Sequence, residues 1–169
     1  MIEEGAKCLF DVIEESASAV PTHIIVVPGN HDFVLSWALQ RILLSHFRND
    51  KRVTVDNTFT ERKYHLHGQC LLGLTHGEKA VKRLPGLMAR EAPQFSTVRL
   101  REWHTGHFHQ RKEVTTIEGV LMRGHPSLSS ADSWHAGEGF ISDRGMDAII
   151  YHKAGAVVAT HSYTPDVAL

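Results

Sequence analysis

The chain has 169 residues, of which 42% are hydrophobic and 22% are charged, and its formal net charge is -1. This is an ordinary globular composition, and it excludes a chain that is disordered, collagen-like or coiled-coil throughout. No apolar run is long enough for a transmembrane helix. The acidic start, Met1 to Glu4, lacks a signal-peptide layout, and two cysteines are too few for a disulfide framework. We therefore expect a cytoplasmic protein without a membrane partner.

Histidine and the basic residues are distributed unusually. The chain holds 13 histidines, and histidine is the commonest metal ligand among side chains. Residues 41–112 carry 14 basic and 6 acidic side chains, which gives this stretch a net charge of +8. A basic middle suits an anionic substrate, although solvated helix faces would produce the same pattern.

The first half of the chain predicts a helix, a strand and a second helix. Apolar residues recur at helical spacing over residues 2–18. The β-branched run from Ile24 to Val27 is typical of a central strand that is covered on both faces. Pro28-Gly29 ends this strand, and Asp32 is suited to cap a helix over residues 33–47 that carries Leu35, Leu39, Ile42 and Phe47.

The second half predicts mainly strands. We expect a helix over residues 79–90 that is broken at Pro85-Gly86, and a single strand over residues 98–103. Three hairpins are expected, and their strands span residues 62–66 and 69–74, 111–117 and 120–123, and 146–152 and 156–163. This order predicts one α/β domain over residues 1–169, with a mixed sheet.

Three histidine clusters follow apolar strands at the point where each strand gives way to a loop. They are Gly29-Asn30-His31-Asp32, Thr75-His76-Gly77 and Gly106-His107-Phe108-His109. Ligands of open α/β sheets bind at the carboxyl ends of strands. If the three strands are parallel neighbours, all three clusters therefore face one crevice.

The residue types in these clusters favour a metal centre. An extended pair such as His107 and His109 places both imidazoles on one side of the chain, where they can serve two adjacent metals. The flanking glycines allow sharp turns, and Asn30 adds an amide oxygen. Imidazole and amide ligands together suit Mn, Fe, Zn or Ni better than Ca.

These clusters, in this order, resemble the motifs of the calcineurin-like metallophosphoesterase family. The resemblance spans about residues 1–125 and rests on Pro28 to Asp32, His76, and Gly106 to His109. It implies an α/β/β/α sandwich with a two-metal centre, manganese being the leading metal, that activates a hydroxide to attack a phosphoester. On this resemblance, Asn30, His76 and His107 bind one metal and His109 the other. His31 protonates the leaving oxygen or stabilises the transition state, and Asp32 orients His31.

The chain departs from the family pattern before these motifs. The family's D-x-H string and Gly-Asp dipeptide, which supply most ligands of the first metal and the bridging carboxylate, are missing from the sequence. We therefore expect a sandwich that lacks its first strands, with the missing ligands supplied upstream or by a second polypeptide. By itself such a chain should bind one metal weakly and show little or no turnover.

The substrate is not specified by these motifs. The basic middle favours a nucleic-acid phosphodiester, with Arg62, Lys63, Arg111 and Lys112 as the cations to test, and Trp134 could stack on a base. The alternative to an enzyme is a remnant of the same fold that binds metal or phosphate without turnover. A histidine-rich metal buffer fits less well, because the histidines are spread along the chain rather than gathered in a tract.

Overall fold

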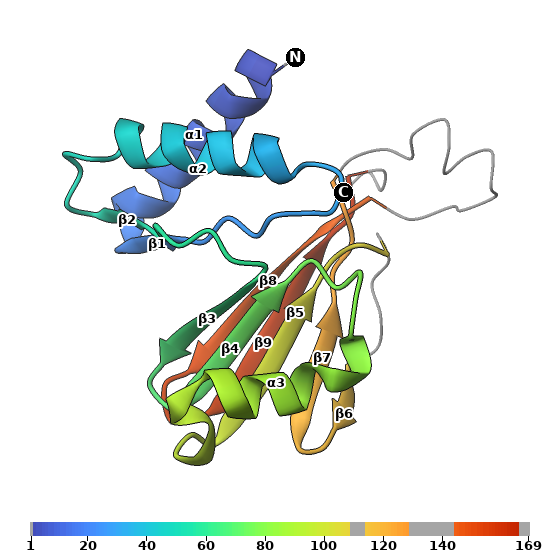
Figure 1. Cartoon of the computed structure of the whole chain (residues 1–169). Helices are drawn as coiled ribbons and strands as arrows, with labels where there is room; N and C mark the ends of the chain where they lie inside the picture. The colour runs from blue at the N-terminus through green and yellow to red at the C-terminus, as the bar shows by residue number, and fades with distance from the viewer. Residues whose placement is uncertain (1, 109–113, 129–143, 166–169) are drawn as a thin grey trace. The chain divides into compact units, whose positions relative to one another are not determined.

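The computed structural model describes residues 2–108, 114–128 and 144–165 (Figure 1). Within these ranges no helix is both long enough and apolar enough to cross a membrane. The chain divides into two compact units, unit 1 (residues 1–60) and unit 2 (residues 61–169). Each unit is described by itself, and the prediction of a single domain remains a prediction.

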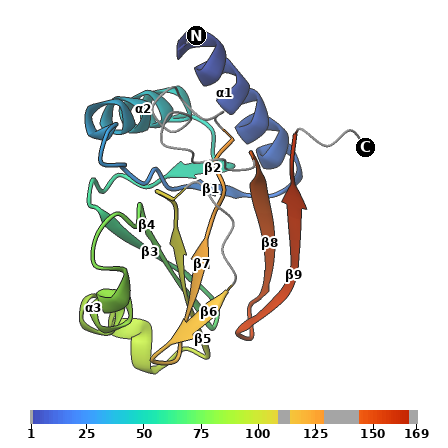
Figure 2. The ribbon, with the colours of Figure 1, turned by 90° about the vertical axis from the view of Figure 1, so that its right-hand side faces the viewer.

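Unit 1 consists of two helices packed on a two-stranded parallel sheet (Figure 2). The sequence forms α1 (Ile2–Ala19), β1 (Thr22–Ile24), α2 (Phe33–His46) and β2 (Val53–Val55). Side chains from both helices and from β2 form the core of unit 1: Ile13, Ala17, Leu43, Phe47 and Val53. The predicted first helix is confirmed, and it buries the face on which Ile13 and Ala17 lie.

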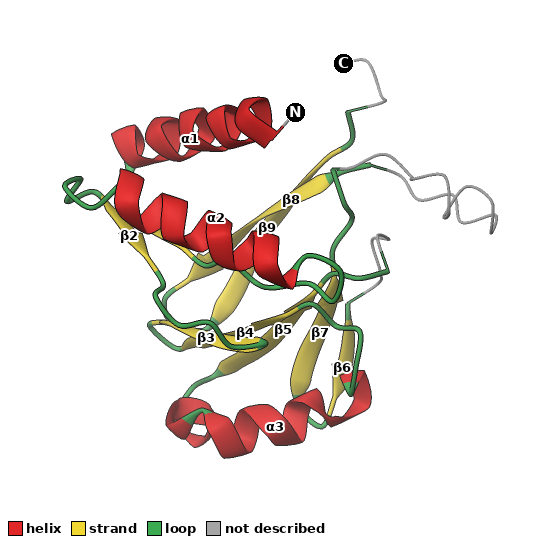
Figure 3. Cartoon of the chain, turned by 45° about the horizontal axis from the view of Figure 1, so that its top comes forward, coloured by secondary structure: helices red, strands yellow, loops and turns green. Residues whose placement is uncertain are grey.

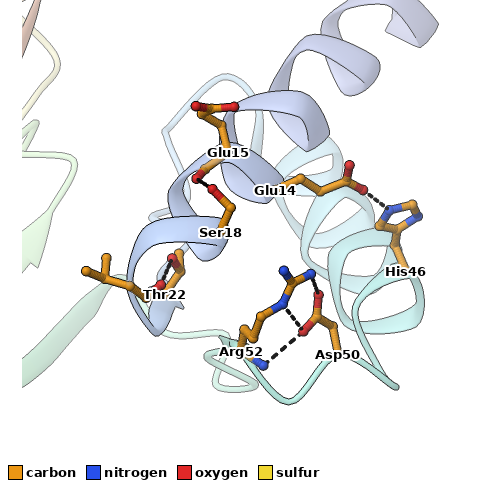
Figure 4. Close-up of polar contacts among 8 residues, drawn as sticks. Glu14, Glu15, Ser18, Thr22, His46, Asp50 and Arg52 are labelled. Carbon is orange, nitrogen blue, oxygen red and sulfur yellow. Dashed lines mark hydrogen bonds and ion pairs between the residues drawn. The ribbon is translucent and has the colours of Figure 1, made fainter.

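Polar contacts link the end of α2 to α1 and order the turn before β2 (Figure 4). His46 at the end of α2 contacts Glu14 on α1, with 3.5 Å between the ring nitrogen and the carboxylate oxygen. Asp50 accepts hydrogen bonds from the guanidinium of Arg52 in the turn before β2, and this guanidinium lowers the pKa of the Asp50 carboxyl to about 2. The pair is solvent-exposed, so it orders the turn rather than adding much stability.

The predicted central strand over residues 24–27 is wrong in two respects. β1 ends at Ile24, and among the described residues it pairs only with β2. The side chain of Gln40, which is fully buried on α2, donates to the backbone oxygens of Asp56 at 2.6 Å and Thr58 at 2.7 Å. These two bonds draw the segment after β2 toward α2, and the ladder therefore stops after Val55.

Helix α2 is confirmed, and of the four apolar residues named from the sequence, Phe47 is buried and Leu39 packs against the core of unit 1. The buried residues of α2 are Ser36, Gln40 and Leu43, whereas Leu35 and Ile42 are exposed. Asp32 does occupy the position before the helix, but its carboxylate does not cap it. The Asp32 Oδ1 atom instead accepts a hydrogen bond of 2.7 Å from the backbone N–H of Gly29.

Unit 2 is a mixed sheet with a helix on one face and a second sheet on the other (Figures 2 and 3). The five-stranded sheet has the order β3-β4-β5-β7-β6, in which β4, β5 and β7 run parallel and the outer strands antiparallel. Its strands are β3 (Arg62–His67), β4 (Cys70–Thr75), β5 (Leu100–Thr105), β6 (Thr115–Ile117) and β7 (Val120–Gly124). The α/β class with a mixed sheet is therefore confirmed.

The faces of this sheet are covered by the remaining elements of unit 2. They are the 3-10 turns η1 (Val81–Arg83) and η2 (Pro93–Ser96), helix α3 (Leu84–Glu91), and the antiparallel pair β8 (Met146–His152) and β9 (Ala156–Tyr163). The three predicted hairpins are confirmed over the described residues, while 111–113 lie outside them. Pro85 lies in the first turn of α3, so the helix begins there instead of breaking.

The apolar core of unit 2 lies between α3 and the sheet. Trp103 is fully buried, and its indole N–H donates to the Leu84 backbone oxygen at 2.9 Å. Gly73 lies beneath this ring on the neighbouring strand β4. A Cβ atom at Gly73 would lie 2.6 Å from Trp103 Cε3 and 2.8 Å from Met88 Cε. The indole therefore packs against β4 only because residue 73 has no side chain.

We expect Gly73→Ala to destabilise unit 2 by about 1–3 kcal/mol, because a rigid indole must move to admit the methyl group. Gly86→Ala is the matched control, since nothing lies within 4 Å of a Cβ at that position of α3. The control should be neutral or stabilising, because alanine is the better helix former. Urea unfolding of the three proteins measures both effects, and equal midpoints for Gly73→Ala and the parent chain would contradict this packing.

Candidate metal centre

The ends of β4 and β5 bring two of the predicted site residues together. His76 follows β4, and His107 lies two residues after β5. Because these strands are parallel neighbours in register, Thr75 opposite Thr105, both histidines lie at the same edge of the sheet. The His107 Nδ1 atom lies 3.0 Å from His76 Nε2, and the two rings meet at 77°.

The backbone around this pair is closely constrained. The N–H of Gly106 donates to the His76 backbone oxygen at 3.0 Å. Gly77 has a φ of +90°, and a Cβ there would lie 2.8 Å from Thr105 Cβ, so only glycine fits between the two strand ends. His107 has a φ of +63°, an uncommon conformation for a residue with a side chain, and such strain tends to occur at functional sites.

The pair supplies two metal ligands. Two facing imidazole nitrogens suit a borderline transition metal such as Zn²⁺, yet a stable zinc site uses three or four protein ligands. Among the residues described, no group of three or more histidine, cysteine or acidic side chains is placed to hold a metal ion. His76 and His107 therefore fit part of a metal centre, and the remaining ligands must come from elsewhere.

The other predicted site residues belong to unit 1 or lie outside the described residues. Asn30, His31 and Asp32 lie in unit 1 in the loop before α2, and all three side chains are exposed. The hydrogen bond of Asp32 to Gly29 closes this loop. His109, Arg111, Lys112 and Trp134 lie outside the described residues. The strand before Asn30, β1, pairs with β2 within unit 1.

Two of the predicted substrate cations are already engaged. Arg62 forms a fork-like pair with Glu91, with 2.8 Å between its Nη2 atom and Oε1. Tyr64 donates to the same carboxylate at 2.7 Å, and the bonded Arg62 guanidinium lowers the Glu91 pKa. Lys63 is only 4% exposed. Neither side chain is suited to bind a substrate phosphate, whereas Lys79, Lys82 and Arg83 after His76 are exposed.

A third histidine at this edge was not among the metal ligands expected from the sequence. His125 directly follows β7, the next parallel strand, and its backbone N–H donates to the Thr105 oxygen at 2.8 Å. Thus β4, β5 and β7 each end within two residues of a histidine. The signal in the sequence was Gly124-His125 after an apolar strand, the same layout as in the other clusters.

Comparison with known proteins gives structural likenesses only. No family model matches the chain, and no curated protein matches it. Wild-type Vps29 from Entamoeba histolytica complexed with Zn²⁺ is 13% identical, with 94% of this chain and 88% of that chain covered at a TM-score of 0.47. A double mutant of Vps29 from the same organism is 14% identical, with 90% and 87% covered at a TM-score of 0.47. A conserved uncharacterised protein from Streptococcus pneumoniae, a predicted phosphoesterase, is 14% identical, with 84% and 95% covered at 0.36.

We expect zinc affinity to depend on the histidine pair. His107→Ala should weaken Zn²⁺ binding by more than about tenfold, since even outer-shell partners of a metal contribute that much. Binding should also weaken as the pH falls, because protons compete with the metal for imidazole nitrogen. Competition with a chromophoric chelator measures both effects.

His67→Ala is the matched control, because His67 is an exposed histidine on β3. It should leave the affinity unchanged. If the two variants bind zinc as tightly as each other, the pair is not the zinc site.

Proposed function

We propose that this chain is the metal-binding part of a metal-dependent phosphoester hydrolase. One observation supports the proposal. His76 Nε2 and His107 Nδ1 lie 3.0 Å apart at the carboxyl ends of the parallel strands β4 and β5. The Asn30 and His109 ligands and the roles of His31 and Asp32 belong to the proposal, and their support is the sequence motif alone. A divalent metal bound there would supply a Lewis acid for the phosphoryl oxygen.

The residues of the chain have distinct roles in this proposal. His76 and His107 hold a metal through one ring nitrogen each, and the Gly77 turn keeps their backbones in contact. His31, which is exposed, donates a proton to the leaving oxygen of the ester, and Asp32 fixes its loop through Gly29. Manganese, and a second metal once the missing ligands are supplied, are finer parts of the proposal, and iron, zinc or nickel fit the same nitrogen ligands.

The substrate class we propose is a nucleic-acid phosphodiester. Its support is the excess of basic residues over 41–112, with Lys79, Lys82 and Arg83 exposed after His76. A nucleic-acid substrate should bind with an affinity that falls steeply as salt rises, whereas the affinity for a small phosphoester should change little. Binding of single-stranded DNA at two salt concentrations separates the two substrate classes.

A non-catalytic metal- or phosphate-binding protein of the same fold is the second candidate. It is favoured by the lack of a third metal ligand beside His76 and His107 among the residues described. The two candidates differ in turnover and not in metal binding.

Hydrolysis of bis(p-nitrophenyl) phosphate by the Mn²⁺-loaded chain, together with metal analysis, tests the proposal. We expect at most one metal per chain and a low rate that His107→Ala abolishes while His67→Ala retains it. A rate that is equal in the parent chain and in His107→Ala contradicts hydrolysis at this site. Two metals per chain with rapid turnover contradict the incomplete ligand set.

A further inference from the structure

Five side chains form a continuous series of hydrogen bonds between the five-stranded sheet and the β8–β9 sheet. Tyr151 Oη lies 3.0 Å from Glu102 Oε2 and 3.0 Å from His104 Nε2. His104 Nδ1 lies 2.8 Å from His125 Nε2, and His125 Nδ1 lies 3.3 Å from Asp147 Oδ2. We call these five residues, Glu102, Tyr151, His104, His125 and Asp147, the polar chain.

Both ends of the polar chain are carboxylates. Glu102 is fully buried, and its carboxylate forms an ion pair with Arg123, whose Nε atom donates to Oε1 at 2.6 Å. The Asp147 side chain is 3% exposed, and its Oδ1 atom accepts a bond of 2.7 Å from the Ser162 hydroxyl. An ionised carboxylate has no hydrogen to give, so both ends of the polar chain only accept.

The polar chain has one hydrogen fewer than its hydrogen bonds need when all its tyrosine and histidine side chains are neutral. Its four contacts need one hydrogen each. Neutral Tyr151 supplies one hydroxyl hydrogen, and neutral His104 and His125 supply one ring N–H each, which makes three. Without a fourth hydrogen, two lone pairs face each other at one contact inside the protein, where an unmade hydrogen bond is expensive.

We propose that the polar chain holds one additional proton, shared between His125 and Asp147, and that it thereby positions the histidine-bearing end of β5. With this proton every contact has a donor: Tyr151 donates to Glu102, His104 Nε2 to Tyr151, His125 Nε2 to His104, and His125 Nδ1 to Asp147. The excess charge of the proton and the positive charge of Arg123 balance the two carboxylates.

The proton belongs to the Asp147 end of the polar chain. Burial lowers the pKa of His104 to about 3, with the charges of His125 and Arg123 acting in the same direction, so His104 stays neutral. Burial also lowers the pKa of His125, and the Asp147 carboxylate, which faces its ring, opposes this lowering only in part, so the additional proton is shared with Asp147 rather than held by His125 alone. Other groups near the polar chain are the Cys70 thiol on β4 and the Ser162 hydroxyl on β9.

The polar chain is joined to the candidate metal centre through the backbone. The backbone N–H of His125 donates to the backbone oxygen of Thr105. Gly106, which follows Thr105, donates its backbone N–H to the backbone oxygen of His76. His104, Thr105 and Gly106 lead directly to His107, whose φ of +63° must be held by its surroundings. Only this positioning step rests on the proposed function, because the proton count is independent of any metal.

The direct test is ¹⁵N NMR of the histidine rings in the full metal-free chain near neutral pH. We expect His104 to carry a proton on Nε2 alone and His125 to carry protons on both nitrogens or to share one with Asp147. Neutral signals for both rings, with no proton between His125 and Asp147, would overturn the proposal.

Two substitutions remove the need for the fourth proton by different chemistry. In Asp147→Asn the amide supplies a hydrogen to His125 Nδ1, and in Tyr151→Phe the contacts that remain among His104, His125 and Asp147 need only two hydrogens. Tyr64→Phe is the matched control, since Tyr64 donates to Glu91 elsewhere in unit 2.

The unfolded chain holds neutral histidines above their ordinary pKa, so folding takes up the extra proton. As the pH rises from roughly 7 to 9, the folding equilibrium constant should fall more steeply in the parent chain and in Tyr64→Phe than in Asp147→Asn or Tyr151→Phe. The difference between the two groups of proteins should be up to about tenfold per pH unit. Parallel pH profiles would contradict the extra proton.

Zinc affinity tests the positioning step. In the pH range where the parent chain loses the proton, we expect its Zn²⁺ affinity to fall several-fold relative to Asp147→Asn. If NMR finds the proton but the two zinc profiles run parallel, the positioning role is wrong. If neither protein binds zinc, the proposed function fails and the positioning role fails with it, while the NMR result still decides the proton count.

Discussion

The ion pair between Glu102 and Arg123 is the constraint on which unit 2 depends. A carboxylate that is fully buried between two sheets requires a charged partner. Arg123 on β7 is this partner, with 2.6 Å between its Nε atom and Oε1 of Glu102 on β5. Tyr151 bonds to the same carboxylate from β8. Removing any one of these side chains leaves polar groups buried without partners, and this polar layer therefore fixes how β8 and β9 pack on the larger sheet.

The other face of the same sheet is fixed by packing rather than by polarity. Trp103, next to Glu102 on β5, points to α3 and occupies the space that Gly73 leaves open. Because side chains alternate between the two faces along β5, the Glu102 carboxylate faces the β8–β9 sheet and the Trp103 indole faces α3. Both interactions hold β5 between β4 and β7, and this placement brings His107 to His76.

Local features of the fold could be predicted from the sequence, and long-range ones could not. The hairpins were predictable because Gly68, Gly119 and Gly155 adopt positive φ in their turns. The end of β1 at Ile24 depends on Gln40 binding the segment after β2, which no local pattern reveals. The polar chain joins residues up to 49 positions apart, although Glu102 near the end of the predicted strand and His104 directly after that strand were a visible sign of it.

The most direct measurement is a Zn²⁺ titration of the chain with ¹⁵N-labelled histidines, followed ring by ring. The pairing of His76 and His107 predicts that His76 Nε2 and His107 Nδ1 change first, while the rings of His104 and His125 keep their hydrogen bonds to each other. Zinc-induced changes that begin at His104 or His125, or that spread evenly over the 13 histidines, would contradict a metal centre at the ends of β4 and β5.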